Sequence, residues 1–390
     1  MRSNNIPQGY KQTELGIIPE DWNIKSIGEF LSIGNGHDYK GKSFGNIPVY
    51  GTGGIITHID DYLYDGQTIC IGRKGTIDKP IFHSGKIWTV DTLYYTYNFI
   101  DIEVKFIYYL LLTIDWMSLN EATGVPSLTS DRIKQITLAL PPIAEQRAIA
   151  EALSDVDGLI AALDKKIAKK RLLKQGAMQQ LLTGKKRLPG FTDEWVEITF
   201  GEYVDIYRGG SPRPIESYIT DSPNGVNWIK IGDVKPNDKY INKTEERIIP
   251  DGVNRSRRVD VGDFILSNSM SFGRPYILGI DGCIHDGWLV IQNYHNSFDK
   301  DYLYYLLCSE DVMMQYIGMA AGSSVKNLNK EKVASLQLCV PTTIEEQQAI
   351  ATILSDMDKE IADLEAQRDK YRLLKSGMMQ KLLTGQIRLK

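Results

Sequence analysis

The chain has 390 residues, of which 42% are apolar and 24% charged, and its formal net charge is −4. This composition is typical of a globular protein, and the length predicts two or three domains. No apolar run approaches the about 18 residues of a membrane helix and no secretory leader occurs, so a cytoplasmic location is expected. The negative charge argues against a protein that holds nucleic acid by bulk electrostatics alone.

Residues 1–141 are predicted to form a globular domain with a short N-terminal lead segment. Apolar residues alternate in short runs between Gly-rich turns, for example in residues 68–71 and 87–90, which indicates strands. Residues 104–111 combine tyrosines with aliphatic residues at helical spacing, which indicates a helix facing a core. A mixture of strands and helices in one segment favours an α+β domain.

Residues 36–43 match the spacing of a phosphate-binding loop that ends in Lys-Ser. Such a loop must open a helix whose N-terminal amides hold the phosphate. The following residues, 44–54, are rich in Gly and include Pro48, so they cannot supply that helix. We interpret the match as accidental and predict no nucleotide site there.

Residues 142–188 are predicted to form one long helix. Pro141 and Pro142 mark its start, and Thr183 followed by Gly184 marks its stop. About 40 residues at 1.5 Å each make a rod of about 60 Å, too long for the interior of either flanking domain. Apolar residues step by four and three in alternation, which predicts a coiled-coil seam of Ile149, Leu153, Val156, Ile160, Leu163 and Ile167.

This helical sequence occurs twice. Residues 346–389 match residues 145–188 at 26 of 44 positions without a gap. Thr343 and Glu346 predict a capping box at the start of the second helix, which extends over residues 342–390. Its seam comprises Ile350, Leu354, Met357, Ile361 and Leu364, and Arg368 interrupts it where the first copy has Ile167.

The segment between the helices, residues 189–341, resembles the first domain at both ends. Trp195 and residues 201–203 repeat the spacing of Trp22 and residues 28–30. The offset between matching residues grows from 173 at the start to 201 at the end, so the second domain is the longer one. The chain therefore reads as domain, helix, domain, helix, with divergent middles in the two domains.

Two helices with matching apolar stripes can bury those stripes against each other. Because a whole domain separates them along the chain, we expect an antiparallel pair with one domain at each end. The predicted fold is α+β, with two globular α/β domains separated by two long antiparallel helices that form a coiled coil, in a quasi-twofold internal repeat. The alternative is that each helix packs on its own domain as an ordinary amphipathic helix.

No stretch combines the residues that a catalytic site acting on nucleic acid would need. A DNA-adenine methyltransferase requires Asn or Asp before Pro-Pro, and the single Pro-Pro pair, at residues 141–142, lacks it. The five histidines do not have the spacing of metal ligands. The four cysteines form no CxxC pair and are predicted to be reduced core residues. We predict no catalytic residue and no metal site.

Loops of both domains carry Arg, Lys and Asn, the side chains that read base edges and hold phosphates. The predicted DNA-binding residues are Lys40, Lys42, Asn46, Arg73 and Lys74 in the first domain, and Arg208, Arg213, Arg255, Arg257, Arg258, Asn268, Arg274, Lys326 and Asn327 in the second. Scattered surface charge is the alternative for each residue singly. Two divergent domains on one spacer favour readers of a two-part DNA site.

These motifs resemble the specificity (S) subunits of type I restriction–modification systems, over essentially the whole chain. The specific marks are the Pro-x-x-Glu-Gln-x-x-Ile opening at Pro142 to Ile149, the related opening at Pro341 to Ile350, the Arg-Leu-Leu-Lys runs at 171–174 and 372–375, and the Gln-x-Leu-Leu-Thr-Gly closings at 179–184 and 380–385. Pro-Glu-Asp-Trp at 19–22 and Thr-Asp-Glu-Trp at 192–195 introduce the two domains.

The resemblance implies two target-recognition domains, residues 1–141 and 189–341, and two spacer helices, residues 142–188 and 342–390. It implies double-stranded DNA and two modification (methyltransferase) subunits as partners, with motor-nuclease restriction subunits in the full complex. S-adenosylmethionine, ATP and Mg²⁺ would then belong to the partners, and this chain would be a non-catalytic subunit of an adenine-N6 methyltransferase and endonuclease complex.

Two alternatives stay open. One is the specificity subunit of a related type IIB/IIG-like enzyme whose partner both methylates and cleaves. The other is a coiled-coil scaffold that binds no DNA, against which the divergence confined to the domains argues. The similar lead segments before Trp22 and Trp195 further predict that the two chain ends lie close together, in a cyclic layout.

Overall fold

The computed structural model describes residues 6–235, 238–268, 273–320 and 328–389, and it divides into two compact units. The first unit comprises Met1–Asp164 with Ala366–Lys390, and the second comprises Lys165–Glu365. Each unit therefore holds one globular domain together with part of each long helix, α4 (Ile143–Leu181) and α8 (Ile344–Leu382). No helix in the described ranges is long and apolar enough to cross a membrane.

The first domain contains ten strands and three short helices, besides a 3-10 turn at Trp116–Leu119. The strands are β1 (Tyr10–Thr13), β2 (Gly16–Pro19), β3 (Asn23–Ser26), β4 (Ser32–Asn35), β5 (Phe44–Gly51), β6 (Gly54–Ile59), β7 (Tyr64–Gly72), β8 (Ile81–Thr89), β9 (Leu93–Tyr97) and β10 (Thr137–Leu140). The helices are α1 (Ile27–Phe30), α2 (Val104–Leu111) and α3 (Ser130–Lys134).

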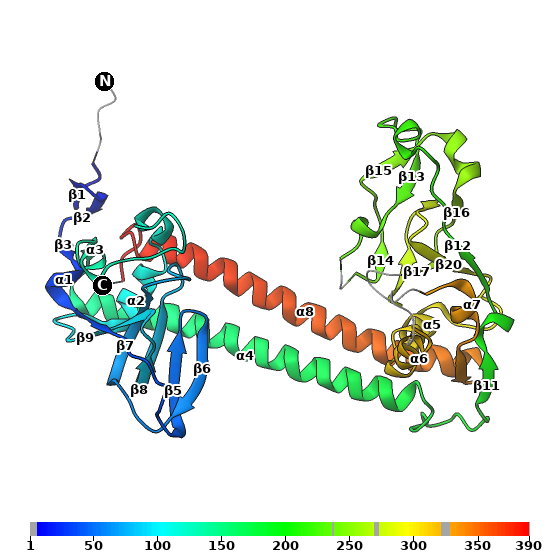
Figure 1. Cartoon of the computed structure of the whole chain (residues 1–390), viewed down its shortest axis with the longest axis horizontal. Helices are drawn as coiled ribbons and strands as arrows, with labels where there is room; N and C mark the ends of the chain where they lie inside the picture. The colour runs from blue at the N-terminus through cyan, green and yellow to red at the C-terminus, as the bar shows by residue number, and fades with distance from the viewer. Residues whose placement is uncertain (1–5, 236–237, 269–272, 321–327, 390) are drawn as a thin grey trace. The chain divides into compact units, whose positions relative to one another are not determined.

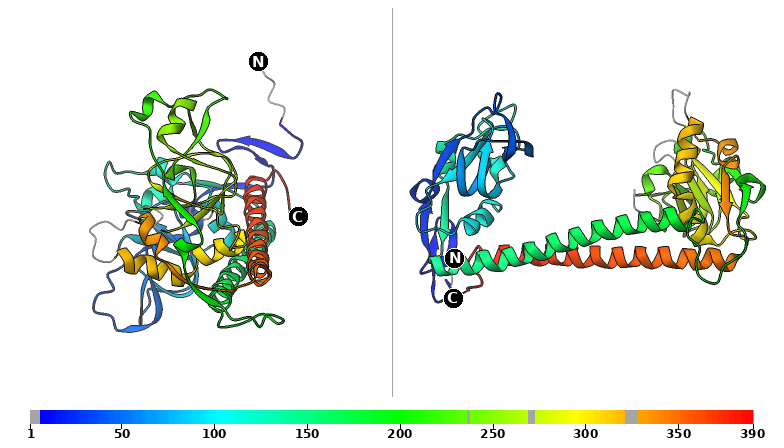
Figure 2. Two further views of the ribbon diagram at one scale, coloured as in Figure 1. Left: turned by 90° about the vertical axis from the view of Figure 1, so that its right-hand side faces the viewer. Right: turned by 90° about the horizontal axis from the view of Figure 1, so that it is seen from below.

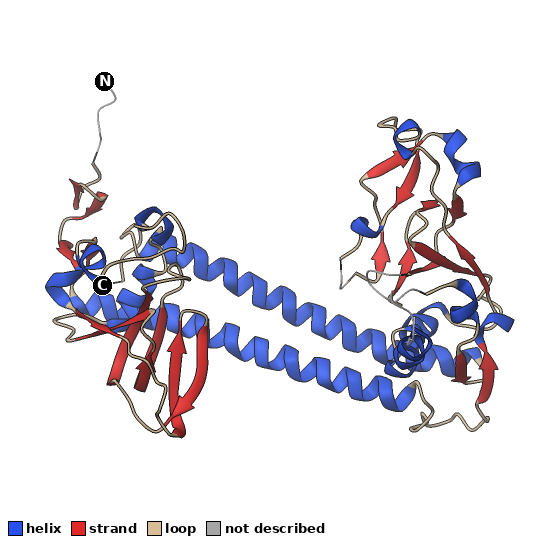
Figure 3. Cartoon of the chain, in the orientation of Figure 1, coloured by secondary structure: helices blue, strands red, loops and turns tan. Residues whose placement is uncertain are grey.

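The second domain has more and shorter strands in its described residues (Figure 3). These are β11 (Val196–Thr199), β12 (Asp205–Arg208), β13 (Val226–Ile229), β14 (Tyr240–Ile241), β15 (Glu246–Ile248), β16 (Arg257–Val259), β17 (Phe264–Ser267), β18 (Pro275–Leu278), β19 (Gly282–Ile284), β20 (Trp288–Gln292) and β21 (Gln337–Val340). The α-helices are α5 (Lys300–Leu307), α6 (Glu310–Ala320) and α7 (Lys330–Ala334).

Each domain contains an antiparallel four-stranded sheet with the same strand order. Its order is β4-β9-β7-β8 in the first domain and β12-β20-β17-β18 in the second. The first domain extends this sheet by β5 and β6, whereas the second adds β14 and a separate sheet of order β15-β13-β19-β16. The repeat noticed in the sequence is therefore a repeat of fold, and the divergent middles are different additions to a common sheet.

Strand periodicity explains how the second domain buries both faces of its sheet. Phe264 and Leu266 of β17 join the core that contains α5, while Ile265 between them joins the core under the second sheet. Successive side chains of a strand point to opposite faces, so a strand covered on both sides reads as a continuous apolar run. Figure 1 shows α5 close to β17 and β20 on one side of this sheet.

One cysteine departs from the core position expected for all four. Cys70 and Cys283 are buried and Cys308 is partly buried, but Cys339 is exposed. Cys339 lies on β21, which pairs only with β11, and alternate residues of that strand face solvent. A two-stranded ribbon leaves one face open, and sequence alone does not say which residues of a strand take that face.

Both long helices take part in each unit, and they run in opposite directions alongside one another (Figure 1; Figure 2). In the first unit, Asp157 of α4 pairs with Lys375 of α8 at 2.7 Å, and Asp164 contacts Arg368 at 3.4 Å. In the second unit, Lys170 pairs with Glu360 at 2.7 Å and Lys174 with Asp358. Partner numbers that fall on one helix as they rise on the other identify an antiparallel pair.

The residues of the predicted seam are buried or half-buried along both helices. Leu153, Ile167 and Leu354 are at most 3% exposed, and the other seam positions are buried or half-buried. The first turns also pack on their own domains, because Ile149 and Leu153 belong to the core of the first domain, and Ile350 and Leu354 to that of the second. Paired helices and domain packing, which the sequence presented as alternatives, thus occupy different stretches of the same helices.

Each helix enters its domain through a buried Glu-Gln pair. Gln146 accepts from the amide of Glu103 and donates to the carbonyl of Pro141, and Gln347 makes the equivalent bonds to Asp299 and Pro341. A buried amide side chain satisfied on both sides fixes the helix start relative to the domain. This explains why the Glu-Gln motif stands at the opening of both helices.

A second polar cluster at each domain joins α2 or α5 to both long helices. The Tyr109 hydroxyl donates to Asp157 at 2.8 Å, and Lys375 pairs with the same carboxylate. Tyr305, Asp358 and Lys174 repeat this arrangement in the second unit. Burial first, and then the neighbouring carboxylate, raise the pKa of both tyrosines above the ordinary value, so both remain hydrogen-bond donors.

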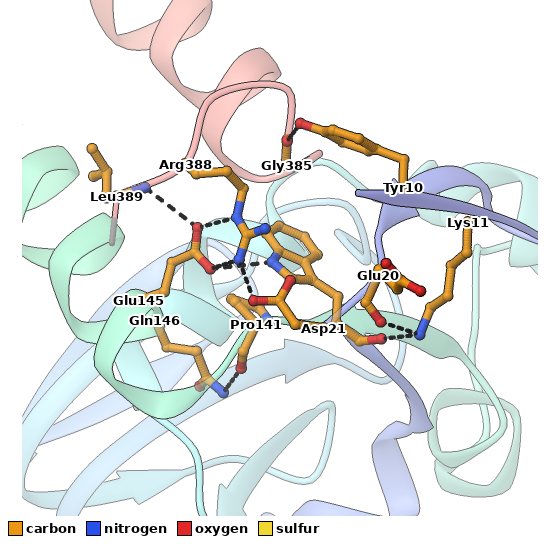
Figure 4. A network of polar contacts seen from close by, with 11 residues as sticks. Tyr10, Lys11, Glu20, Asp21, Pro141, Glu145, Gln146, Gly385, Arg388 and Leu389 are labelled. Carbon is orange, nitrogen blue, oxygen red and sulfur yellow. Dashed lines mark hydrogen bonds and ion pairs between the residues drawn. The ribbon is translucent and has the colours of Figure 1, made fainter. Parts of the chain in front are cut away.

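The segments near the two chain ends meet in the first unit, as the sequence predicts (Figure 4). The Tyr10 hydroxyl donates to the carbonyl of Gly385 at 2.8 Å. Arg388, beyond the end of α8, forms ion pairs with Asp21 and with the buried Glu145 at 2.7 Å. Hydrogen bonds from Arg388 first to Glu145 and then to Asp21 raise the pKa of this guanidinium, so Arg388 stays charged.

The same cluster occurs in the second unit without a chain break. Arg187, just beyond α4, forms a two-pronged ion pair with the buried Glu346, and its guanidinium lies over the ring of Trp195. Gly184 adopts a left-handed conformation, with φ of 68°, and turns the chain against Trp195; Gly385 does so at 70° against Trp22. In the second unit, residues 185–194 connect the end of α4 covalently to Trp195. In the first unit, the end of α8 and the segment before Trp22 are joined only by contacts.

We expect Arg388→Ala to loosen the first unit, because it leaves the Glu145 carboxylate, which is 3% exposed, without its guanidinium. Removing one partner of a buried ion pair costs on the order of 3 kcal/mol. Hydrogen–deuterium exchange should therefore accelerate in peptides covering residues 10–30 and 143–153. Arg187→Ala should do the same to residues 195–204 and 344–354.

Arg147→Ala is the matched control, since Arg147 lies exposed on the same turn of α4 as Glu145. It should leave both sets of peptides unchanged. Exchange in Arg388→Ala equal to that of this control would contradict the assigned role of the Glu145 cluster.

Candidate nucleic-acid interface

In each domain, three loops meet at the same end of the shared sheet. We call this region the loop edge. It comprises residues 36–43, 73–76 and 90–92 in the first domain, and residues 209–214, 268 and 285–287 in the second. The first loop follows β4 or β12, the second follows β7 or β17, and the third precedes β9 or β20.

Equivalent backbone hydrogen bonds assemble the two loop edges. In the first domain the amide of Arg73 donates to Thr92 at 2.8 Å, and in the second the amide of Asn268 donates to Gly287 at 3.1 Å. The carbonyls of Arg73 and Asn268 then accept from Leu128 and Leu328, each at 2.9 Å. The two domains thus present different side chains from one backbone arrangement.

A close approach of chains fixes the first loop of each edge. A side chain at Gly36 would begin 2.0 Å from the carbonyl oxygen of Val90, and one at Gly209 would begin 2.1 Å from that of His285. Only glycine fits such contacts. These glycines allow the first and third loops to approach closely in both domains. Lys40 and Arg213 each follow the glycine by four residues, so they occupy equivalent positions in the first loop.

In the first domain four of the predicted residues lie on the loop edge, Lys40 and Lys42 in its first loop and Arg73 and Lys74 in its second. Arg73 donates to the carbonyl of Asp91 at 3.3 Å, and the backbone of Lys74 forms an isolated antiparallel β-bridge with that of Ser127. Lys42 is held by Asp61 at 2.7 Å and lies 5.0 Å from the centre of the Trp88 ring. Lys40 and Asn46 are exposed on the same loop and the start of β5.

In the second domain, Arg208, Arg213 and Asn268 converge on one residue that sequence reasoning did not single out, Asp286. Arg208 and Asn268 donate to its backbone carbonyl at 3.2 and 3.1 Å, and Arg213 reaches its carboxylate at 3.5 Å. Asn268 is only 6% exposed, so it supports the loops from below. The presence of Arg, Lys and Asn in loops could not reveal Asp286, because an acidic side chain does not itself bind bases or phosphates.

Two further arginines of the second domain stack on aromatic rings, one on the exposed Tyr207 and one on the partly buried Tyr218. Arg257 lies 4.7 Å from the centre of the Tyr207 ring, and Arg255 lies 5.5 Å from that of Tyr218. Stacking restricts the long side chain while leaving its donors available. Tyr207 immediately precedes Arg208, so Arg257 adjoins the loop edge, whereas Arg258 contacts Asp260 at 3.9 Å.

Arg274 does not share this position. It lines a groove of about 870 Å³ where the domain meets the long helices, together with Lys174, Tyr304 and Cys308. Its position close in sequence to Asn268 did not reveal this. Pro275 pairs with Leu266, so the backbone of Arg274 starts at the same end of the sheet as Asn268, and yet Arg274 lines the groove. Lys326 and Asn327 lie outside the described residues.

The groove beside Arg274 has a counterpart in the first unit. Arg171, Lys174, Gln175, Met178 and Gln179 line the groove of the second unit, and Arg372, Lys375, Ser376, Met379 and Gln380 line the other. The two sets occupy matching positions of the helical repeat. Among the described residues, no group of three or more His, Cys, Asp or Glu side chains could hold a metal ion.

The chain contains an α+β domain twice. In each copy cationic side chains lie on the equivalent loop edge, and both long helices pack in each unit. These features define a two-domain recognition protein. The chain belongs to the type I restriction modification DNA specificity domain family, whose model matches residues 19–170 and 192–371. The family resemblance noted from the helical motifs is thus confirmed, and the family is matched once in each half.

Relatives in Methanocaldococcus jannaschii align over nearly the whole chain. The putative type I restriction enzyme MjaX specificity subunit is 26% identical over 98% of this chain and 97% of the relative. The type I restriction enzyme MjaVIII specificity subunit is 25% identical over 96% of this chain and 94% of the relative. Both alignments therefore span nearly all of this chain and of each relative.

Solved structures share the fold at low sequence identity. The S subunit of a type I restriction–modification system from M. genitalium has a TM-score of 0.63 at 14% identity, covering 98% of this chain and 97% of that one. A chain from a study of complex assembly and conformational transition of the type I R-M system has a TM-score of 0.60 at 16% identity, covering 95% and 99%. The predicted fold class is confirmed.

Proposed function

We propose that this chain is the DNA-specificity subunit of a type I complex in which each domain reads one half of a bipartite DNA site. The observation that carries the proposal is the loop edge, which has one backbone arrangement in both domains and different side chains on it. A protein that recognises two unlike half-sites needs this combination of a constant frame and divergent tips. Its acidic net charge is compatible with DNA binding if the partners supply most of the phosphate contacts.

The side chains divide by the chemistry they offer. Several donors that suit guanine edges or phosphates come from Arg73 and Lys74 on the first loop edge, from Arg213 on the second, and from Arg208 and Arg257 beside it. Lys40 and Lys42 also lie on the first loop edge, and Asn46, Arg255 and Arg258 lie outside the loop edges. Asn268 supports the second edge, and Arg274, Lys326 and Asn327 complete the proposed set.

The helix pair is proposed as the spacer. We assign recognition to residues 1–141 and 189–341, and spacing to residues 142–188 and 342–390. The ion pairs along the helices and the buried seam resist sliding, since sliding would separate Asp157 from Lys375 and Asp358 from Lys174. A fixed rod would set the number of base pairs between the half-sites.

The chemistry of the complex is proposed to lie in the partners. Two methyltransferase subunits would bring S-adenosylmethionine and modify adenine, and restriction subunits would bring ATP and Mg²⁺ chemistry. The present chain would supply recognition and no catalytic group, in the cytoplasm where its DNA is.

Two leucine pairs are the proposed methyltransferase docking points. Leu172 and Leu173 on α4 are 69% and 50% exposed, and Leu373 and Leu374 on α8 are 76% and 51% exposed. They occupy matching positions of the repeat, one pair in each unit, beside the two matching grooves. Adjacent exposed leucines on both copies of a charged helix favour a partner that binds twice.

Replacing residues 23–139 with the corresponding segment of a relative should change one half of the methylated sequence. The second domain and the spacer are untouched, so the other half and the gap should persist. Methylome sequencing of a strain that carries the hybrid and its methyltransferase subunit measures all three. A change in both halves would contradict separate reading by the two domains.

Insertion of four residues at matched points in the middle of α4 and α8 should widen the gap. The rod grows by about 6 Å and DNA rises 3.4 Å per base pair, so the gap should increase by about one or two base pairs. Both half-sites should stay the same. Replacement of four exposed residues at the same points without insertion is the control, and an unchanged gap in the lengthened variant would refute the spacer role.

Leu172→Gln with Leu173→Gln should remove one of two methyltransferase subunits, and Leu373→Gln with Leu374→Gln should remove the other. Native mass spectrometry of the purified complex counts the copies. Leu159→Gln serves as control, because Leu159 is 48% exposed on α4 but corresponds to Glu360 in the second copy. Two bound copies in both double variants would exclude these leucines as docking points.

A further inference from the structure

Asp286 lies in the turn between β19 and β20, and side chains from three loops contact it. Its carboxylate accepts from the Ser211 hydroxyl at 2.9 Å and lies 3.0 Å from His285 Nε2, and Arg213 lies at 3.5 Å. Its backbone carbonyl accepts from Arg208 and Asn268. Asp286 therefore joins all three loops of the second loop edge.

The contacts fix the chemical state of the group. The amide of Gly287 donates to His285 Nδ1 at 2.9 Å, so the ring hydrogen is on the other nitrogen, Nε2, which lies 3.0 Å from the Asp286 carboxylate. Burial acts to raise the pKa of Asp286, but the Ser211 hydrogen bond and then His285, Arg213 and Arg208 outweigh it and lower the pKa. Asp286 is accordingly an anchored anion at neutral pH.

The side chains of Asp286 and Arg213 differ in how far solvent reaches them. The Asp286 side chain is 33% exposed, whereas that of Arg213 is 80% exposed. The anchor is therefore largely covered while the guanidinium beside it faces outward. With Arg208 and Arg213 against one carboxylate, the group keeps a net positive charge and can meet DNA without repelling phosphates.

A purely structural role would take another form, which Asp281 illustrates in the same domain. Asp281 accepts from the amide of Val261 at 2.8 Å, and its carbonyl accepts from Asn227. Each of those bonds joins a side chain to a backbone group, and neither involves a cation. Asp286 instead uses its carboxylate on Ser211, His285 and Arg213, which are side chains of the loop edge.

The first domain has the same backbone position without the same anchor. Asp91 precedes β9 as Asp286 precedes β20, and its carbonyl accepts from Arg73. Asp91 is exposed, and the residue that corresponds to Ser211, Asp38, accepts from the amide of Lys40 instead. The carboxylate anchor thus belongs to the half of the molecule that carries the arginine-rich edge.

We propose that Asp286 is a positioning residue of the second recognition domain, which holds Arg213 directly and residues 209–213 through Ser211 in the orientation that reads the second half-site. This inference rests on the proposed function, and it adds which group sets the stringency of that half-site. Arginine reads bases by a rigid two-pronged geometry, so a guanidinium that is free to swing loses discrimination.

The test is Asp286→Asn in the full chain, purified with its methyltransferase partners. Asparagine keeps the size and one acceptor oxygen but removes the charge that holds Arg213. Methylation rates on a panel of DNA duplexes, each with one base pair substituted, give the discrimination at each position. We expect discrimination to fall about tenfold at one or more positions of the second half-site and to stay unchanged in the first, since one arginine–base contact is worth about 1 to 3 kcal/mol.

Three companion variants keep the outcome decisive. Asp281→Asn should leave discrimination unchanged, and Asp286→Glu should restore part of it. Ser211→Ala, which removes one bond without burying a charge, should shift discrimination in the same direction and less, and it decides the question if Asp286→Asn does not fold. Thermal unfolding and the number of bound methyltransferase subunits establish that each complex is intact.

An intact Asp286→Asn complex, or an intact Ser211→Ala complex where the former fails to fold, with unaltered discrimination in the second half-site would overturn the inference. If the parent complex methylates no bipartite sequence, the proposed function fails instead. The two failures are therefore distinguishable in one set of measurements.

Discussion

A buried carboxylate at the first turn of each long helix is the constraint on which the rest of the structure depends. Glu145 and Glu346 are 3% and 1% exposed, and a charge so covered is tolerated only with a partner. That partner, Arg388 or Arg187, lies beyond the end of the other long helix. Neither helix can therefore seat its domain without the other, and the two must run in opposite directions to meet this condition.

The same constraint has two solutions in the two units. In the second unit, residues 185–194 lead from α4 past Glu346 into β11 without a break. In the first unit, the surroundings of Glu145 come from two separate segments, residues 385–389 and 10–22, which Arg388, Tyr10 and Asp21 hold together. The surroundings of the buried carboxylate are therefore alike in both units, although the covalent connection differs.

Sequence predicted those parts of the fold that are periodic or local. A seam of alternating spacing, Pro-marked starts and Gly-marked stops specify a long helix through contacts within a few residues, and the duplication of that pattern specified the pairing. The antiparallel arrangement followed from connectivity alone. Both the long helices and the meeting of the chain ends could be deduced before any coordinates.

The candidate site was less accessible to sequence because strand register brings its residues together. Arg208, Asn268 and Asp286 are up to 78 positions apart, and nothing local marks them as neighbours. Arg274 shows the converse, since it is close to Asn268 in sequence but lies in the groove at the helices. Residue type identified some binding candidates, but it missed Asp286, whose role is visible only through the cations around it.

Under the proposed function, the separation of a constant frame from variable tips allows one architecture to serve different DNA targets. The frame consists of the Glu-Gln helix starts, the tyrosine clusters and the shared sheet, all present in both units. The tips are the loop edges, where the backbone repeats and side chains do not. A change in the tips leaves the buried contacts untouched, so recognition can diverge while stability is retained.

Methylome sequencing of a strain that carries the unaltered chain with its methyltransferase subunit tests the central claim most directly. The account predicts methylated adenines within a bipartite sequence of two dissimilar specified halves separated by a fixed number of unspecified base pairs. A single continuous recognition sequence, or two halves with a variable gap, would contradict it.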